Sequence, residues 1–164
     1  MHSRLFVISE SNKIMRQAEE VDFIDNSFVG CVADYVGEVK SVDKMKEDIV
    51  DWFFNYLKNH FEGYIEVNEK DFSFKVKKGT VKKIFEDKID KMIKTLEEKQ
   101  FSKDTREYRH LFYEISEIMN DTTGFYLAFV EECNVSYYTL DDFLQWEYNE
   151  DKTYYINQVF DYHC

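Results

Sequence analysis

The sequence predicts an α+β protein: a single domain over residues 1–164 in which a mainly antiparallel sheet packs against amphipathic helices. A chain of 164 residues with 44% hydrophobic and 18% aromatic residues can build one sizeable core. Segments with strand-like patterns follow one another in adjacent pairs, as in antiparallel hairpins. Segments with helical period stand apart from those pairs, and this order favours the α+β class.

Two strands and a short helix are expected in the first forty residues. The apolar run at residues 4–9 predicts a strand. Apolar residues at helical spacing behind a Ser or Asn cap predict a short helix over residues 11–21. Residues 27–39 are rich in Val and aromatic residues, which predicts a strand with a bulge at Gly30. We expect Cys31, in the same segment, to be a small core residue.

The middle of the chain is expected to form a helix, a hairpin and a second helix. Apolar residues recur every three or four positions over residues 41–57, which predicts a helix with one apolar face. Residues 63–68 and 71–77 predict a β-hairpin, because apolar and polar residues alternate in the second segment. Thr80 is expected to cap the next helix. The apolar stripe of that helix comprises Val81, Ile84, Phe85, Ile89, Met92, Ile93 and Leu96.

A third long helix is expected to begin at the capping-box pair Asp104 and Glu107. Its side chains at helical spacing predict a buried face. That face comprises Tyr108, Leu111, Phe112, Ile115 and Met119.

The last forty residues are expected to close the sheet. Residues 124–131 and 135–139 predict paired strands. Thr139 and Asp142 have the spacing of a helix cap and predict a short helix that runs to about residue 148. Residues 153–163 predict a final strand.

The charge of the chain is negative and unevenly placed. The net charge is −12, and residues 101–164 contribute −9 of it with 4 bases against 13 acids. This excess makes nucleic acid and anionic membranes poor partners and a basic protein a good one. Residues 70–99 are the exception, with ten lysines against six acids, but they contain no arginine and suit the wet face of an amphipathic helix. We therefore expect no direct binding of nucleic acid and no membrane association.

A cytoplasmic location is expected. The longest uncharged apolar run, residues 124–130, is far shorter than the ~20 residues that a helix needs to span a bilayer. The first residues lack the apolar core of a secretory signal. Three cysteines without CxxC spacing are typical of reduced thiols in the cytosol.

The stretch YYTLDDFLQWEYNEDKTYYI, residues 137–156, combines carboxylates with tyrosines and a tryptophan. Tyr and Trp are the rings that protein interfaces favour, and carboxylates fixed beside them present a negative field to a basic partner. For a single residue, the simpler interpretation is a core ring or a solvated acid; for the whole cluster, we favour a binding face. The predicted partner-binding residues are Glu131, Glu132, Asp141, Trp146, Glu147, Tyr148, Glu150 and Asp151.

His110 is the strongest catalytic candidate in the sequence. Glu107 at i−3 and Glu114 at i+4 can face it on a helix, and a carboxylate beside an imidazole suits general base catalysis. The alternative is a chance pair on a solvated helix face, and we favour that alternative. We therefore predict no catalytic residue.

No metal site or cofactor is expected either. Glu131, Glu132, Asp141 and Asp142 could gather around Mg²⁺ or Ca²⁺, but their spacing fixes no geometry and the EF-hand pattern is missing. The glycine-rich phosphate-binding motifs and the common hydrolase and zinc-protease motifs are missing as well.

These observations predict a small, acidic, non-enzymatic interaction protein. We expect an inhibitor that blocks the basic nucleic-acid-binding surface of another protein, such as a nuclease or another nucleic-acid-binding enzyme, as a nucleic-acid mimic. Nuclease-toxin immunity proteins and anti-defence proteins of bacteriophages and mobile elements, such as anti-restriction and anti-CRISPR proteins, have this style of composition, which is an analogy of composition only. Two alternatives stay open: a small enzyme that uses a His110–carboxylate pair, and a homo-oligomeric structural subunit such as a homodimer.

Overall fold

The computed structural model describes residues 2–13, 16–98, 105–119, 124–131 and 134–163. It confirms the α+β class, with a mixed sheet of seven strands and helices around it. The strands are β1 (His2–Ser9), β2 (Tyr35–Glu38), β3 (Ile65–Asn68), β4 (Ser73–Val76), β5 (Phe125–Val130), β6 (Val135–Thr139) and β7 (Thr153–His163). Their order is β3-β4-β7-β1-β5-β6, with β2 also paired to β7. β1 and β5 are parallel and the other described pairs are antiparallel.

The helices include three long helical segments and several short turns. They are α1 (Glu20–Asp25), α2 (Phe28–Cys31), α3 (Val42–Asp48), the π-helix η1 (Ile49–Phe54), α4 (Asn55–His60), α5 (Thr80–Glu98), α6 (Thr105–Met119), α7 (Leu140–Leu144) and the 3₁₀ turn η2 (Glu147–Asn149). α3, η1 and α4 follow one another without a break and confirm the helix predicted over residues 41–57. None of the helices in the described part of the chain is both long enough and apolar enough to cross a bilayer.

The long strand β7 lies in the middle of the sheet and carries a bulge. Val7 pairs with Gln158 and Ile8 with Ile156, so Asn157 has no partner across the ladder. The extra residue in β7 changes which side of the sheet the following side chains face, so residues an odd number apart can lie on the same side. Tyr154, Ile156 and Val159 consequently reach the same core although their spacing is uneven.

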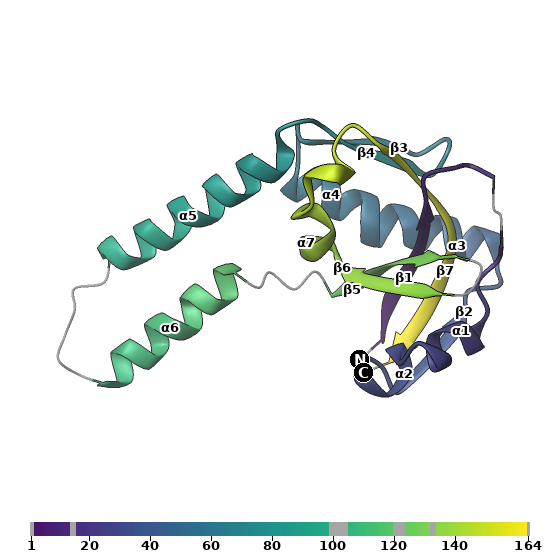
Figure 1. The fold of residues 1–164 in the computed structure, drawn as a ribbon, viewed down its shortest axis with the longest axis horizontal. Coiled ribbons are helices and arrows are strands. Elements are labelled where there is room, and N and C mark those ends of the chain that lie inside the picture. Colours follow the sequence, from purple (N-terminus) through teal and green to yellow (C-terminus); the bar gives the residue numbers. More distant parts are fainter. Residues whose placement is uncertain (1, 14–15, 99–104, 120–123, 132–133, 164) are drawn as a thin grey trace.

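Helices lie around the sheet (Figure 1), and a hydrophobic core lies on each of its two faces. Aromatic rings dominate the first core, which lies under α3–η1–α4 and α7. Its largest buried rings are Phe6, Phe53, Phe54, Phe74, Phe125, Phe143 and Tyr154. The second core lies under α1 and α2 and contains Phe23, Phe28, Phe160 and Tyr162. A sheet covered on both sides is a rigid support for short surface elements.

Helices α5 and α6 form a hairpin that projects away from the sheet (Figure 1). We call these two helices the arm and the rest of the described chain the body. Near the base of the arm, the Lys88 ammonium donates to the Asp141 carboxylate at 2.6 Å and to the Met119 carbonyl at 3.1 Å. These contacts join α5 both to α7 and to the end of α6.

The two long helices predicted from about residues 80 and 104 are present as α5 and α6. The prediction that one face of α6 is buried is wrong. Phe112 is 72% exposed and Met119 is 44% exposed, whereas Leu111 is buried. The reason is that α6 packs on α5 rather than on the sheet, so a second helix covers only part of the stripe. Asp104 and the side chain of Glu107 lie outside the described residues.

The start of α5 also differs from the prediction. The Thr80 hydroxyl donates to the Tyr64 carbonyl at 3.0 Å instead of capping the helix. The Glu150 carboxylate takes the capping role, because it accepts from the backbone N–H groups of Gly79 at 2.8 Å and Val81 at 2.9 Å. A residue distant in sequence therefore supplies the cap.

The region before residue 40 contains three further corrections. In segment 11–18, residues 11–13 and 16 form bends and residues 17 and 18 have no regular structure. The first helix begins only at Glu20, where the Asp22 carboxylate accepts from the Glu19 N–H at 2.8 Å. Only Tyr35–Glu38 of the strand expected over residues 27–39 is a strand. Gly30 has a left-handed φ of 98° and lies in the tight turn α2, which bends the chain. Cys31 is exposed rather than buried in the core.

Candidate partner-binding surface

A stacked pair of aromatic rings, Trp146 and Tyr148, lies on the surface of the body beside η2. The Trp146 ring stacks on the Tyr148 ring with 5.5 Å between centroids and 19° between planes. On another side, Trp146 meets the Tyr138 ring of β6 edge-on at 4.7 Å. Tyr148 is 62% exposed, so the pair rests on the body through Trp146 and opens to solvent at Tyr148. Rigid, exposed aromatic area of this kind is a frequent anchor in protein interfaces.

Buried hydrogen bonds hold the ring pair in place. Asn149, which follows Tyr148, is buried; its amide donates to the Phe143 carbonyl at 2.6 Å and its carbonyl oxygen accepts from the Tyr154 hydroxyl at 2.7 Å. Burial raises the pKa of Tyr154 well above its usual value, so this phenol stays a neutral donor. The turn is thereby fixed to the sheet with Tyr148 on its outer side.

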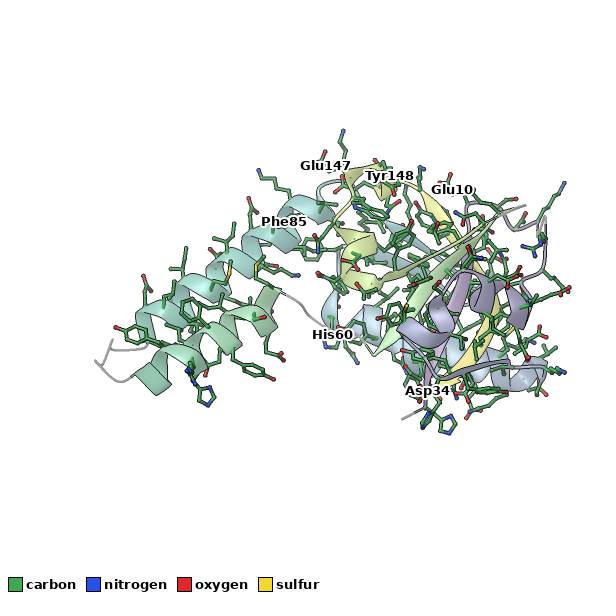
Figure 2. All side chains as sticks on the ribbon, turned by 60° about the horizontal axis from the view of Figure 1, so that its bottom comes forward. Glu10, Asp34, His60, Phe85, Glu147 and Tyr148 are labelled. Carbon is green, nitrogen blue, oxygen red and sulfur yellow. The ribbon has the colours of Figure 1, made fainter. Side chains whose placement is uncertain are left out.

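Carboxylates from two distant segments border the rings. Figure 2 shows Glu147 and Tyr148 near Glu10, which follows the end of β1, whereas Asp34 lies toward the opposite side of the body. The Lys152 ammonium is 2.6 Å from the Glu10 carboxylate and 5.6 Å from the centre of the Tyr148 ring. Lys152 therefore connects Glu10 to the ring pair through a salt bridge and a cation–π contact.

We call Glu10, Trp146, Glu147, Tyr148 and Asp151 the acidic-aromatic patch. Asp151 lies in a turn with a left-handed φ of 61°, and its carboxylate is 3.7 Å from the Lys75 ammonium. The pKa of Tyr148 is raised, mainly because its hydroxyl is partly shielded from solvent and to a smaller extent because Tyr138 lies nearby. The Tyr148 hydroxyl is consequently neutral at physiological pH and can both donate and accept a hydrogen bond.

The structure places three of the predicted partner-binding residues elsewhere, namely Glu131, Asp141 and Glu150. Glu150 caps α5, and Asp141 accepts from Lys88 at 2.6 Å and from the Gln145 amide at 2.7 Å. Both carboxylates are occupied by structural contacts at the base of the arm. Glu131 follows β5 at the far end of its hairpin from α7, roughly 15 Å away at 3.3 Å per strand residue. Glu132 lies outside the described residues.

One residue of this surface, Glu10, was not predicted from the sequence. It lies more than 130 residues before the rings it borders. Lys152 offered one signal, since it is the only base after Glu114 and a lone cation among acids is expected to have a carboxylate partner.

The net negative charge of the chain lies outside the segment that holds the arm. The segment 80–119, which contains both arm helices, has nine bases and nine acids, and the rest of the chain has 12 bases against 24 acids. Seven of those 12 bases pair with carboxylates of the described residues, namely Arg4, Arg16, Lys44, Lys58, Lys75, Lys77 and Lys152. Internal pairing leaves an excess of carboxylates facing solvent, and the body presents a negative field.

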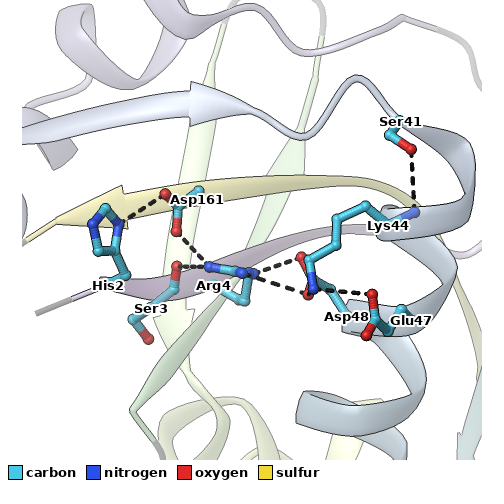
Figure 3. Close-up of polar contacts among 8 residues, drawn as sticks. All are labelled: His2, Ser3, Arg4, Ser41, Lys44, Glu47, Asp48 and Asp161. Carbon is cyan, nitrogen blue, oxygen red and sulfur yellow. Dashed lines mark hydrogen bonds and ion pairs between the residues drawn. The ribbon is translucent and has the colours of Figure 1, made fainter.

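A second cluster of charges surrounds Arg4 on β1, but its contacts are structural (Figure 3). The Arg4 guanidinium donates to Asp48 at 2.7 Å and to Asp161, and it lies 5.2 Å from the centre of the Trp52 ring. Lys44 adds a second cation 3.2 Å from Asp48, whose side chain is only 1% exposed. The two carboxylates and the ring occupy the guanidinium, and the cluster ties β1 to α3 and β7.

His110 lies on α6 of the arm. Its Nδ1 is 3.7 Å from a Glu114 carboxylate oxygen and its side chain is 75% exposed. This is the geometry of a solvated pair on a helix face. No group of three or more His, Cys, Asp or Glu in the described part of the chain is arranged to hold a metal ion.

A shallow depression of about 430 Å³ lies over β3, β4 and the start of β7. Its polar lining includes Glu66 and Lys75, and both already have partners, in Lys77 at 3.3 Å and Asp151 at 3.7 Å. The only ring in this lining, Phe74, is buried, whereas the acidic-aromatic patch exposes Tyr148, so the patch is the stronger candidate.

Comparison with protein-family models, with curated proteins and with solved structures gave no match for this chain. The acidic-aromatic patch and the separation of charge between body and arm are therefore the features on which a function can be proposed.

Proposed function

We propose that the protein is a non-enzymatic binding protein that occupies a basic, nucleic-acid-binding surface of another protein. The observation that carries the proposal is the Trp146–Tyr148 stack, with Trp146 half-buried and Tyr148 exposed, bordered by carboxylates in the part of the chain outside residues 80–119 that has all of the net negative charge. The partner is a nuclease or another nucleic-acid-binding enzyme, and binding blocks its access to nucleic acid.

The physical chemistry of such binding has two parts. A nucleic-acid duplex carries about one negative charge per 1.7 Å of its axis, and the proteins that bind it use Lys and Arg to neutralise these phosphates. A strongly acidic protein surface is attracted to the same Lys and Arg residues. The charge accelerates encounter, and the rings then supply buried contact area in the complex. Glu147 and Glu10 are suited to pair with cations at the rim, while Tyr148 enters the contact.

A charge-matched pair of triple variants tests the proposal. The patch variant combines Glu10→Gln, Glu147→Gln and Asp151→Asn, and the control combines Asp25→Asn, Asp34→Asn and Glu62→Gln at exposed positions elsewhere on the body. Each variant keeps 21 bases and reduces 33 acids to 30, so both have a net charge of −9. Immobilised wild-type protein and both variants are exposed to a bacterial lysate treated with nuclease, and retained proteins are identified by mass spectrometry.

We expect the wild-type protein and the control to retain the same basic nucleic-acid-binding protein and the patch variant to lose at least about tenfold in retention, since each desolvated charge pair contributes on the order of 1.5 kcal/mol or more. Equal loss in both variants would show that overall charge, not the patch, governs binding. Retention of acidic or neutral proteins alone would contradict the proposal.

A further inference from the structure

The arm exposes large apolar side chains along its whole length. Phe112 is 72% exposed and Ile89 is 49% exposed, which is unusual for residues of their size. Apart from Tyr113, which lies on the other side of α6, the exposed large apolar residues described on the arm are Phe85, Ile89, Ile93 and Leu96 of α5 and Tyr108, Phe112 and Met119 of α6. We call these seven residues the apolar arm face.

Helical geometry places both stripes on the same side of the arm. In α5, half-buried residues such as Lys88 and Met92 mark the side that meets α6, and Ile89 and Ile93 directly follow them. In α6, Phe112 directly follows the buried Leu111 in the same way. One residue is a rotation of about 100° in a fixed sense. Because the two helices of the hairpin run antiparallel, equal rotations from their seam bring both stripes to one side.

The opposite side of the arm is satisfied by ion pairs. Lys83 lies 2.8 Å from Asp87, and Lys94 lies 3.7 Å from Glu98, at i,i+4 spacing. Three of these residues directly precede a half-buried residue of the seam, so they are rotated away from the apolar arm face. The arm thus has one apolar face and one face with ion pairs, on which Tyr113 is the large exposed ring of the described residues.

We infer that two copies of the chain associate through their apolar arm faces and form a four-helix bundle. Two helices side by side make a single layer and cannot enclose a core between them. A second hairpin placed on the apolar arm face supplies the missing layer, and four helices around one core are a stable arrangement.

The distribution of charge favours a second copy as the occupant. The segment 80–119 is neutral, with nine bases and nine acids, so two arms do not repel each other and the arm has no net charge with which to attract an acidic or a basic partner. The 19 residues of α5 span roughly 28 Å, which is several times the screening length of about 8 Å at physiological salt. An antiparallel pair of arms consequently keeps the two acidic bodies far enough apart for salt to screen their repulsion.

Sedimentation velocity over a range of protein concentrations tests this inference on the full-length chain. We expect the wild-type protein to reach the mass of a dimer, twice 19.9 kDa. Phe112→Ser removes one large side chain from each copy, and the loss of two buried rings is expected to weaken dimerisation about 100-fold. Ile89→Ser tests the other helix in the same way.

Tyr113→Ser is the matched control, since Tyr113 is the next residue in α6, is 61% exposed and points away from the seam. It is expected to leave the dimer unchanged. Circular dichroism and thermal melting of each variant at low concentration establish that the monomer stays folded. A wild-type protein that stays monomeric at all concentrations overturns the inference, as does a dimer that Phe112→Ser and Ile89→Ser do not weaken.

Salt separates this inference from the proposed function. Added NaCl screens repulsion between acidic bodies, so the dimer is expected to hold or strengthen from 0.05 to about 0.5 M salt. Binding through the acidic-aromatic patch is expected to weaken over the same range. A dimer that dissociates as salt rises would show that the contact is ionic and would overturn an apolar interface.

Discussion

At the scale of single residues, carboxylates that are close in the acidic stretch of the sequence make different contacts in the structure. Glu147 faces solvent beside the stacked rings, whereas Glu150, three residues later, accepts from two backbone N–H groups at the start of α5. Asp142 completes the cap at Thr139, whose hydroxyl oxygen accepts from the Asp142 N–H at 3.1 Å. Only the first of these is available to a partner, so the sum of charge in the stretch overstates the contact surface.

The hydrogen bond between Tyr154 and Asn149 holds the turn that carries Tyr148 against the sheet. Tyr154→Phe removes the hydroxyl and leaves the Asn149 carbonyl oxygen buried without its 2.7 Å partner. We expect a loss of about 1–3 kcal/mol in the free energy of unfolding, measured by urea denaturation. Tyr155→Phe, at the half-buried neighbour, is the control and is expected to cost less. Equal stability of wild type and Tyr154→Phe would contradict the assigned hydrogen bond.

The same residue gives a pH dependence. Burial raises the pKa of Tyr154 above the value of about 10 for an unfolded tyrosine. Between these two values, the native state holds a proton that the unfolded state releases, so the contribution of Tyr154 is complete below pH ~10 and is lost as pH rises further. Unfolding free energy should therefore fall above pH 10, and the slope should be shallower for Tyr154→Phe. Identical slopes would show that Tyr154 is not the group responsible.

At the scale of secondary-structure elements, the arm depends on a cap supplied by the body. Glu150 accepts from the N–H groups of Gly79 and Val81, which have no carbonyl partner within the helix. Its charge also lies at the positive end of the α5 dipole. The carboxylate thus couples the turn after η2 to the base of the arm.

Glu150→Ala is expected to destabilise the first turn of α5 by about 1–2 kcal/mol. Hydrogen exchange followed by mass spectrometry should show faster exchange in peptides that cover residues 79–84. Glu147→Ala removes an equal charge that caps no helix and serves as control. Unchanged exchange at residues 79–84 in Glu150→Ala would show that the cap contributes little.

Local periodicity explains which elements were predictable. The helix from residue 42, the hairpin β3–β4 and the strand β7 were predicted because their apolar spacing is regular over many residues. The helix expected over residues 11–21 had too few apolar positions, and contacts of Glu19 and Asp22 move the start of α1 to residue 20. Periodicity also identified the apolar stripes of α5 and α6, but it cannot tell what covers such a stripe, since that depends on tertiary packing.

The candidate site was predicted in part for the same reason. Trp146, Glu147, Tyr148 and Asp151 are close in sequence, so composition alone could bring them together. Glu10 joins them only through the placement of β1 against β7 in the sheet. The structural roles of Asp141 and Glu150 depend on partners in α5, more than 50 residues earlier, that no local pattern reveals.

At the scale of the whole molecule, charge and apolar surface are separated in space. The chain outside residues 80–119 contains the net charge of −12 and the acidic-aromatic patch, and the segment 80–119, which holds the arm, is neutral and exposes an apolar face. We propose from this separation two kinds of association, one ionic and directed at a foreign protein, the other apolar and directed at a second copy. Because the surfaces are distinct, a dimer leaves both patches free to bind.

Competition between this protein and a nucleic acid for the captured partner tests the proposed function most directly. The partner is bound to a fluorescent 24-base-pair duplex, or to an RNA of similar length, and increasing amounts of wild-type protein or of the two triple variants are added. We expect wild type and control to displace the nucleic acid completely at 0.15 M salt, with an affinity that falls as salt rises, and the patch variant to need at least tenfold more protein. A ternary complex of partner, nucleic acid and this protein would contradict occupation of the nucleic-acid-binding surface.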